Sequence, residues 1–171
     1  MKNILRLTPG NQAPVVIKSL SGRSLIADAN QVFDSYISPN FVDLKFNLPG
    51  VATPQTFLQL HDMIDNGSPL DVFNCLPGLW SQKWLSQNQV IDFCKTWPGW
   101  LTRKECSNLF LCKKDESKLI DEKRPYANLF IVRIEVFPDG LFAGVHRILE
   151  DYKAWNDEYR HRIISPKLKK I

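Results

Sequence analysis

The spacing of apolar residues indicates helices in the first two thirds of the chain. Apolar residues in 54–65 and in 86–97 recur every three or four positions, which is the spacing of one helical face. Ser86 and Gln89 add the pattern of a capping box, in which each side chain bonds the backbone amide of the other residue. A Ser-Pro pair predicts a further short helix at 69–75.

Shorter apolar runs indicate strands before and after these helices. Segments 14–20 and 24–28 are rich in Val, Ile and Leu, and the Ser-Gly-Arg between them suits a tight turn, so they predict an N-terminal hairpin. Residues 107–113 also have the composition of a strand, although the same residues fit the start of a helix.

The strongest strand signal is a hairpin at about 128–149. Two runs of β-branched and aromatic residues flank Pro-Asp-Gly at 138–140, a sequence that suits a type I turn followed by a glycine bulge. A turn of this kind pairs Val136 with Phe142 and places both on the buried face. Arg133 then lies on the opposite face, which we expect to be half exposed.

These elements predict an α+β fold. We expect an N-terminal hairpin and several short helices, followed by an antiparallel sheet that contains the hairpin at about 128–149. The chain length suits a single domain over 1–171. A basic C-terminal tail at 165–171 can be disordered.

The composition argues for a folded chain and against membrane insertion. Of the 171 residues, 44% are apolar and 23% are charged, which is close to the average for globular domains. No apolar run reaches the length of a membrane-spanning helix, and the first residues lack the pattern of a signal peptide. We therefore expect a cytoplasmic protein with no membrane partner, whose four cysteines are free thiols.

A cluster of tryptophans gives the first candidate binding surface. Four of the five tryptophans lie between residues 80 and 100, and tryptophan is enriched at protein interfaces. The candidate contacts are Trp80, Trp84 and Trp100. The alternative is that all four tryptophans fill the core, with the segment from Trp97 to Trp100 forming a buried or half-buried turn around Pro-Gly.

Nucleic-acid binding is the second hypothesis. Residues 87–112 can be interpreted as a helix-turn-helix-like segment, which would place Arg103, Lys104 and Asn108 at the exposed start of the second helix. The net charge is +4, and the last thirteen residues contain five basic side chains and no acidic one. Those basic candidates are Arg160, Arg162, Lys167, Lys169 and Lys170.

Signals for catalysis are weak. Asp139, Asp151 and Lys153 resemble the loose PD-(D/E)-x-K pattern of metal-dependent nucleases, but Asp139 falls at the tip of the predicted hairpin. The cysteine spacings do not suit a zinc site. We therefore expect a small, non-catalytic binding or adaptor protein without cofactor or metal, whose first candidate partner is a protein. Nucleic acid is the alternative, and a nuclease is a distant third.

Overall fold

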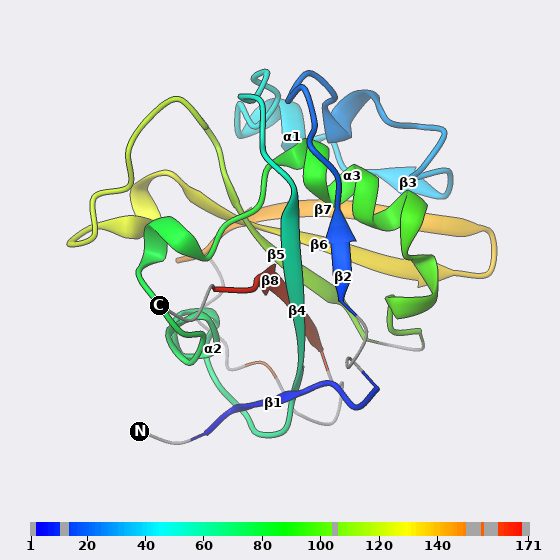
Figure 1. The fold of residues 1–171 in the computed structure, drawn as a ribbon. Helices are drawn as coiled ribbons and strands as arrows, with labels where there is room; N and C mark the ends of the chain where they lie inside the picture. The colour runs from blue at the N-terminus through cyan, green and yellow to red at the C-terminus, as the bar shows by residue number, and fades with distance from the viewer. Residues whose placement is uncertain (1–2, 11–13, 104–105, 150–154, 156–160, 169–171) are drawn as a thin grey trace.

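The protein is built around one mixed β-sheet (Figure 1). The computed structural model describes residues 3–10, 14–103, 106–149, 155 and 161–168. Eight strands form the sheet in the order β1-β4-β8-β5-β6-β7-β3, and β2 also pairs with β4. The strands are β1 (Leu5–Leu7), β2 (Val15–Ile17), β3 (Tyr36–Ile37), β4 (Thr56–Met63), β5 (Asn108–Lys113), β6 (Leu129–Phe137), β7 (Gly140–Arg147) and β8 (Arg162–Pro166).

Short helices connect and cover these strands. Three of them are α-helical in the described residues, and four more are single turns of 3-10 helix. They are α1 (Asn40–Asp43), α2 (Pro69–Asn74) and α3 (Gln87–Thr96), with η1 (Ile26–Asp28), η2 (Trp80–Gln82), η3 (Pro98–Trp100) and η4 (Pro125–Ala127). None of the helices in the described part of the chain is long and apolar enough to cross a membrane.

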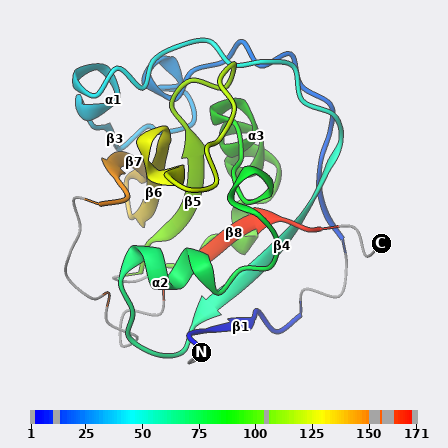
Figure 2. The same ribbon diagram turned by 90° about the vertical axis from the view of Figure 1, so that its left-hand side faces the viewer.

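Each face of the sheet packs against its own apolar cluster. On the first face, Phe93 of α3 meets Phe110 of β5 with ring centroids 5.5 Å apart. On the second face, Phe73 of α2 belongs to a cluster with Leu111 and Ile163, whose side chains alternate with those of the first cluster along β5 and β8. The helices α2 and α3 are well separated in space (Figure 2). Because both faces are covered, the central strands are apolar on both sides.

The expected fold class was wrong, because the described residues are dominated by a mixed sheet and contain few helices. The N-terminal hairpin does not form: Val15–Ile17 pairs with β4, and Ile26–Asp28 is a 3-10 turn. The helix expected at 54–65 is the strand β4. Leu58 and Leu60, two residues apart, both point to the first face of the sheet. Pairing with β1, β2 and β8 stabilises the strand more than the partly regular apolar spacing of this segment would stabilise a helix.

Helices with a complete local signal were predicted correctly. Ser68 and Asp71 form a capping box at the start of α2, and Ser86 with Gln89 does the same for α3. In α3 the Gln89 amide donates to Ser86 Oγ at 3.1 Å, and the Ser86 amide donates to Gln89 Oε1 at 3.0 Å. These bonds join residues three apart, so no distant partner is needed to specify them.

The hairpin predicted at 128–149 is present as β6 and β7, but its register differs by one residue from the expected one. Phe137 pairs with Gly140, so two residues form the loop where three were expected. As a result Phe142 pairs with Glu135 instead of Val136. A shift of one residue moves each side chain of a strand to the other face, so Phe142 lies on the partly exposed face and not in the core.

Gly140 gives a first test of this turn. Its φ is +138°, and a Cβ at this position would overlap Asp34 Oδ1. We expect Gly140→Val to lower the free energy of unfolding by more than about 1 kcal/mol, because a β-branched residue resists positive φ and displaces Asp34. Urea denaturation of both proteins measures the difference. A variant that unfolds at the wild-type midpoint would contradict the turn geometry.

Candidate functional site: an aromatic–arginine surface on the β6–β7 hairpin

The three tryptophans proposed as partner contacts do not form one surface. Trp80 and Trp84 pack against the cluster on the second face, and Trp100 packs against the cluster on the first face. All three are half-buried. Trp97 is half-buried as well, so the turn from Trp97 to Trp100 matches the predicted half-buried turn.

Buried lysines occupy the faces of Trp80 and Trp84. Lys83 Nζ lies 5.0 Å from the ring centroid of Trp80, and Lys113 Nζ lies 4.6 Å from that of Trp84. Each ammonium also donates to a backbone carbonyl, Lys83 to Phe73 at 3.0 Å and Lys113 to Glu116 at 2.9 Å. Burial lowers the pKa of both lysines. Lys83 therefore joins the segment after η2 to α2, and Lys113 stabilises the start of the loop between β5 and β6. The ring faces that these cations cover are closed to a partner.

Two of the proposed nucleic-acid contacts serve the fold instead. Asn108 is fully buried, and its side chain bonds the backbone of Thr102 and the carbonyl of Ile134. Arg162 Nε donates to Asp62 Oδ1 at 2.8 Å, and Arg162 Nη1 donates to the carbonyl of Trp100 at 2.7 Å. Neither side chain is available to a phosphate.

The helix-turn-helix interpretation was also wrong, because the segment after η3 continues into the strand β5 and not into a second helix. Arg103 and Lys167 are exposed, but Arg103 precedes β5 and Lys167 follows β8, at opposite ends of this parallel pair of strands, which are about 16 to 20 Å long. Residues Lys104, Arg160, Lys169 and Lys170 lie outside the described residues.

The loose nuclease pattern gains no support from the geometry. Asp139 lies in the hairpin turn, where it accepts a hydrogen bond from Ser35 Oγ at 3.2 Å, and Asp151 and Lys153 fall outside the described residues. Within the described ranges, no group of three His, Cys, Asp or Glu side chains is placed to hold a metal ion.

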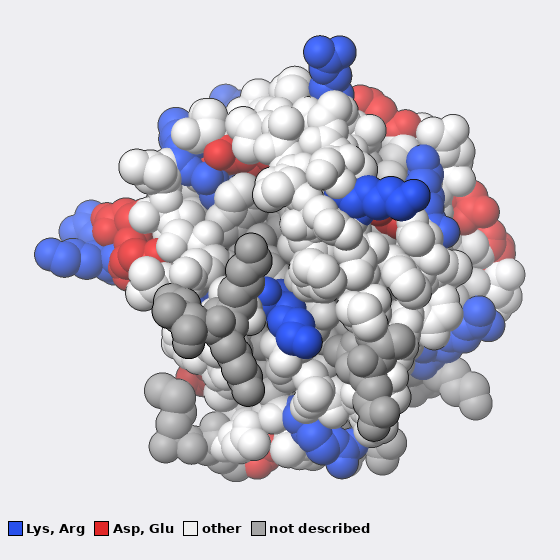
Figure 3. Space-filling view, viewed as in Figure 1, with Lys and Arg blue, Asp and Glu red and all other residues white. Residues whose placement is uncertain are grey.

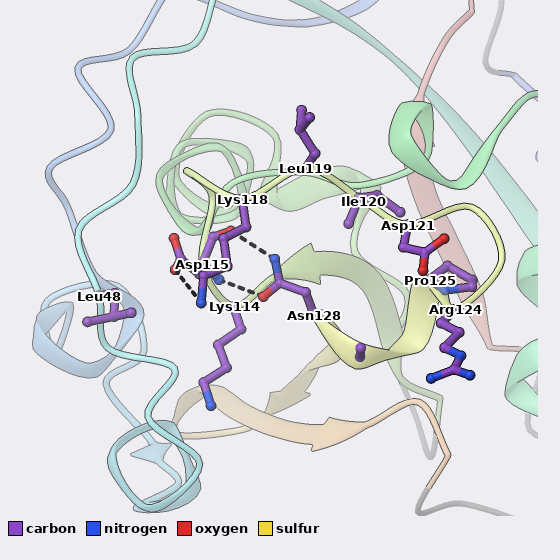
Figure 4. A pocket seen from close by; sticks show the side chains of 11 residues that line it. Leu48, Lys114, Asp115, Lys118, Leu119, Ile120, Asp121, Arg124, Pro125 and Asn128 are labelled. Carbon is purple, nitrogen blue, oxygen red and sulfur yellow. Dashed lines mark hydrogen bonds and ion pairs between the residues drawn. The ribbon is translucent and has the colours of Figure 1, made fainter.

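A pocket of about 400 Å³ lies under the loop that joins β5 to β6 (Figure 4). Lys114, Asp115, Arg124 and Asn128 line part of it. The Asn128 side chain bonds the backbone amide and carbonyl of Asp115, and the Asp115 carboxylate accepts from Ser117. The side chains of Asn128 and Asp115 are therefore engaged in the loop's own hydrogen bonds.

Exposed aromatic rings gather on the second face, close to the turn between β6 and β7. This turn lies well away from α2 (Figure 1). Tyr36 stacks on Phe142, with ring centroids 5.6 Å apart and planes 15° apart. Phe137 meets the same Phe142 ring edge-on at 6.1 Å. Tyr36 is 52% exposed and Phe137 is 44% exposed, so both rings present a large apolar area to solvent.

Arg133 lies beside these rings. Its guanidinium carbon is 5.5 Å from the ring centroid of Phe142, and its Nε is 3.3 Å from Glu135 Oε1, within ion-pair distance but without hydrogen-bond geometry. Gly144, the partner of Arg133 in the hairpin, allows this approach, because a Cβ there would lie 2.9 Å from the Phe142 ring. We call Tyr36, Arg133, Phe137 and Phe142 the aromatic–arginine surface.

Hydrogen bonds fix the segment that carries Tyr36 to the hairpin. Asp34 Oδ1 accepts from the Leu141 amide at 3.0 Å, and the Ser35 amide donates to the Leu141 carbonyl at 3.2 Å. Ser35 Oγ donates to Asp139 across the turn. Because the backbone around Tyr36 is held on both sides, the rings are positioned before any partner arrives.

Carboxylates surround the aromatic–arginine surface. Asp34 and Asp139 are exposed beside the hairpin turn, and Glu135 lies between Arg133 and Ser107, whose Oγ donates to it at 2.9 Å. Figure 3 shows acidic side chains at the right-hand margin, where Figure 1 places the turn between β6 and β7. With three carboxylates and one guanidinium, these residues together carry a net negative charge, although the whole chain is net positive.

Sequence patterns did not identify this surface, although part of its signal was visible. The alternation of side chains along 128–137 placed Arg133 on a partly solvent-exposed face, but the expected register placed Phe142 on the buried face. Tyr36 reaches the surface through the parallel pairing of β3 with β7, which joins residues about a hundred positions apart. Comparisons with protein-family models, curated proteins and solved structures gave no match to this chain.

Proposed function

We propose that the protein is a non-catalytic binding protein that recognises a protein partner through the aromatic–arginine surface. The observation that carries this proposal is the exposure of Tyr36 on β3 and Phe137 on the hairpin, beside Arg133. Tyr, Phe and Arg are enriched in the centres of protein interfaces. Four unbridged cysteines support the further proposal that binding takes place in the cytoplasm.

The charge of the region favours a protein over a nucleic acid. Exposed aromatic rings can stack on unpaired bases, but such sites combine the rings with a positively charged groove. Here Asp34, Glu135 and Asp139 surround the rings and would repel phosphates. The described basic candidates Arg103 and Lys167 lie at opposite ends of other strands and do not offset this repulsion.

The chain offers a matched control for testing the surface. Phe57 on β4 is 44% exposed, the same as Phe137, but β4 lies near the other end of the strand order. A photo-crosslinking amino acid at position 137 should capture one identifiable protein in the cells that make this chain, and the same group at position 57 should not.

The captured protein is then purified and its affinity measured. We expect Phe137→Ala to weaken binding at least about tenfold, as for an aromatic anchor at an interface centre, and Phe57→Ala to change it less than about twofold. Circular dichroism melting shows that both variants are folded. Equal affinities for the two variants would contradict a role of this surface in binding.

A further inference from the structure

We infer that the segment of the partner that contacts the aromatic–arginine surface is basic, with Lys or Arg side chains placed between Tyr36 and the carboxylates of Asp34 and Asp139. This inference rests on the proposed function and specifies the chemistry of the partner. It is carried by the charge and the hydrogen-bond state of the residues around the rings.

The carboxylates of Asp34 and Asp139 each keep one oxygen available. Asp34 Oδ1 accepts from the Leu141 amide and Asp139 Oδ1 accepts from Ser35 Oγ, while their Oδ2 atoms have no hydrogen-bond partner among the described residues. Both side chains are exposed. The bonds at Oδ1 fix the carboxylates, so less side-chain entropy is lost when a cation binds at Oδ2.

Tyr36 supplies a second interaction for the same cation. One face of its ring stacks on Phe142, and the ring remains 52% exposed. A guanidinium or ammonium over an exposed aromatic face gains about 0.5 to 1 kcal/mol, and nearby carboxylates add to this attraction. The protein already uses this geometry internally, since the Arg133 guanidinium packs against Phe142 beside Glu135.

The remainder of the chain makes the preference selective. The last thirteen residues carry five basic side chains and no acidic one, so they account for the positive net charge of the protein. A basic segment is therefore repelled by the C-terminal end and attracted by the region around the hairpin turn. An acidic or phosphorylated segment would be drawn to other basic side chains and repelled by Asp34, Glu135 and Asp139. Charge complementarity of this kind determines which partner and which orientation are accepted.

A random peptide library displayed on phage tests the inference with the full chain. Peptides are selected on the wild-type protein, and those that also bind the Phe137→Ala variant are discarded. We expect the remaining peptides to contain Lys and Arg at least about three times as often as Asp and Glu. A labelled synthetic copy of the most frequent peptide then serves as the probe for affinity measurements.

Neutral variants identify the groups responsible. Asp34→Asn with Asp139→Asn keeps an acceptor oxygen at each position, and should weaken probe binding about five- to tenfold at low salt. Asp92→Asn with Asp121→Asn changes the net charge equally, on α3 and on the loop between β5 and β6, and should change binding less than about twofold. Addition of salt should reduce the difference between the two double variants.

The possible results separate the two proposals. Selected peptides without an excess of Lys and Arg, or equal affinities for the two double variants, would overturn the basic partner and leave the binding surface intact. If no selected peptide depends on Phe137, the proposed function fails as well. Binding of a single-stranded oligonucleotide that Phe137→Ala abolishes would overturn both proposals in favour of nucleic acid.

Discussion

Replacing Trp97 with alanine should lower the free energy of unfolding by about 3 kcal/mol, the lower end of the cost of removing a large aromatic ring from a core, because this ring is half-buried. Trp97 ends α3, and its ring packs against the apolar cluster of the first face. Its Nε1–H donates to the carbonyl of Val16 at 3.0 Å, which joins the end of the helix to the middle of β2. Loss of the ring therefore removes both packing and a link between distant segments.

Two further variants separate these contributions in urea denaturation. Trp97→Phe retains an aromatic ring and loses the hydrogen bond, so we expect a cost of about 1 to 2 kcal/mol. Phe57→Ala removes an exposed ring and should cost less than about 1 kcal/mol. If Trp97→Ala unfolds as easily as Phe57→Ala does, the ring of Trp97 is not part of the core.

The second large effect is expected at Glu116, a carboxylate that is only 8% exposed. Its Oε2 accepts from the Val51 amide at 3.0 Å, and its Oε1 accepts from the Gln87 amide at 3.3 Å, at the start of α3. Glu116→Ala leaves both amides without their acceptor, and we expect a cost of about 2 to 4 kcal/mol. Gly50 faces the same carboxylate, and its lack of a Cβ makes room for it.

Acidity provides an independent test of Glu116. Burial raises its pKa above 4.5, although the amides of Val51 and Gln87 and the charge of Lys113 act in the opposite direction. The folded protein therefore binds this proton more tightly than the unfolded chain does, so the proton stabilises the fold at low pH and this contribution is lost as pH rises through the folded pKa. The cost of Glu116→Gln, which does not titrate, should be larger at pH 4 than at pH 7.5.

The measurement is urea denaturation of the wild type and the Glu116→Gln variant at both pH values. A cost that decreases on acidification would mean that hydrogen bonding and Lys113 dominate, and that the pKa of Glu116 is lowered. Glu122 is a useful control, because its pKa is lowered by hydrogen bonds from Ser81 and its contribution to stability should change in the opposite direction.

Features that the sequence specifies within a few residues could be predicted from it. The helices α2 and α3 were found from Ser68 and Ser86, whose capping partners lie three positions ahead. The hairpin of β6 and β7 was found from runs of β-branched and aromatic residues on either side of one turn. In each of these cases the stabilising partner is close along the chain or the composition is strongly biased.

Features that depend on distant pairing could not be predicted. Thr56–Met63 has apolar residues at positions that suit both helix and strand, and its pairing with β8, about a hundred residues away, decides between them. The candidate site depends on distant pairing in the same way. Tyr36 meets Phe142 only through the pairing of β3 with β7, and the position of Phe142 depends on a loop length that the turn sequence did not fix.

The position of β8 has a consequence for how the protein is made. This strand is inserted between β4 and β5, so until residues 162–166 leave the ribosome the sheet consists of two separate halves. Until then β4 and β5 are open edges with unpaired backbone amides. Each edge also carries apolar side chains that are buried in the complete fold, such as Leu60 on β4 and Phe110 on β5. The sheet is therefore completed only after residues 162–166 have been synthesised, and the unfinished sheet is the state in which a chaperone would protect the nascent protein from aggregation.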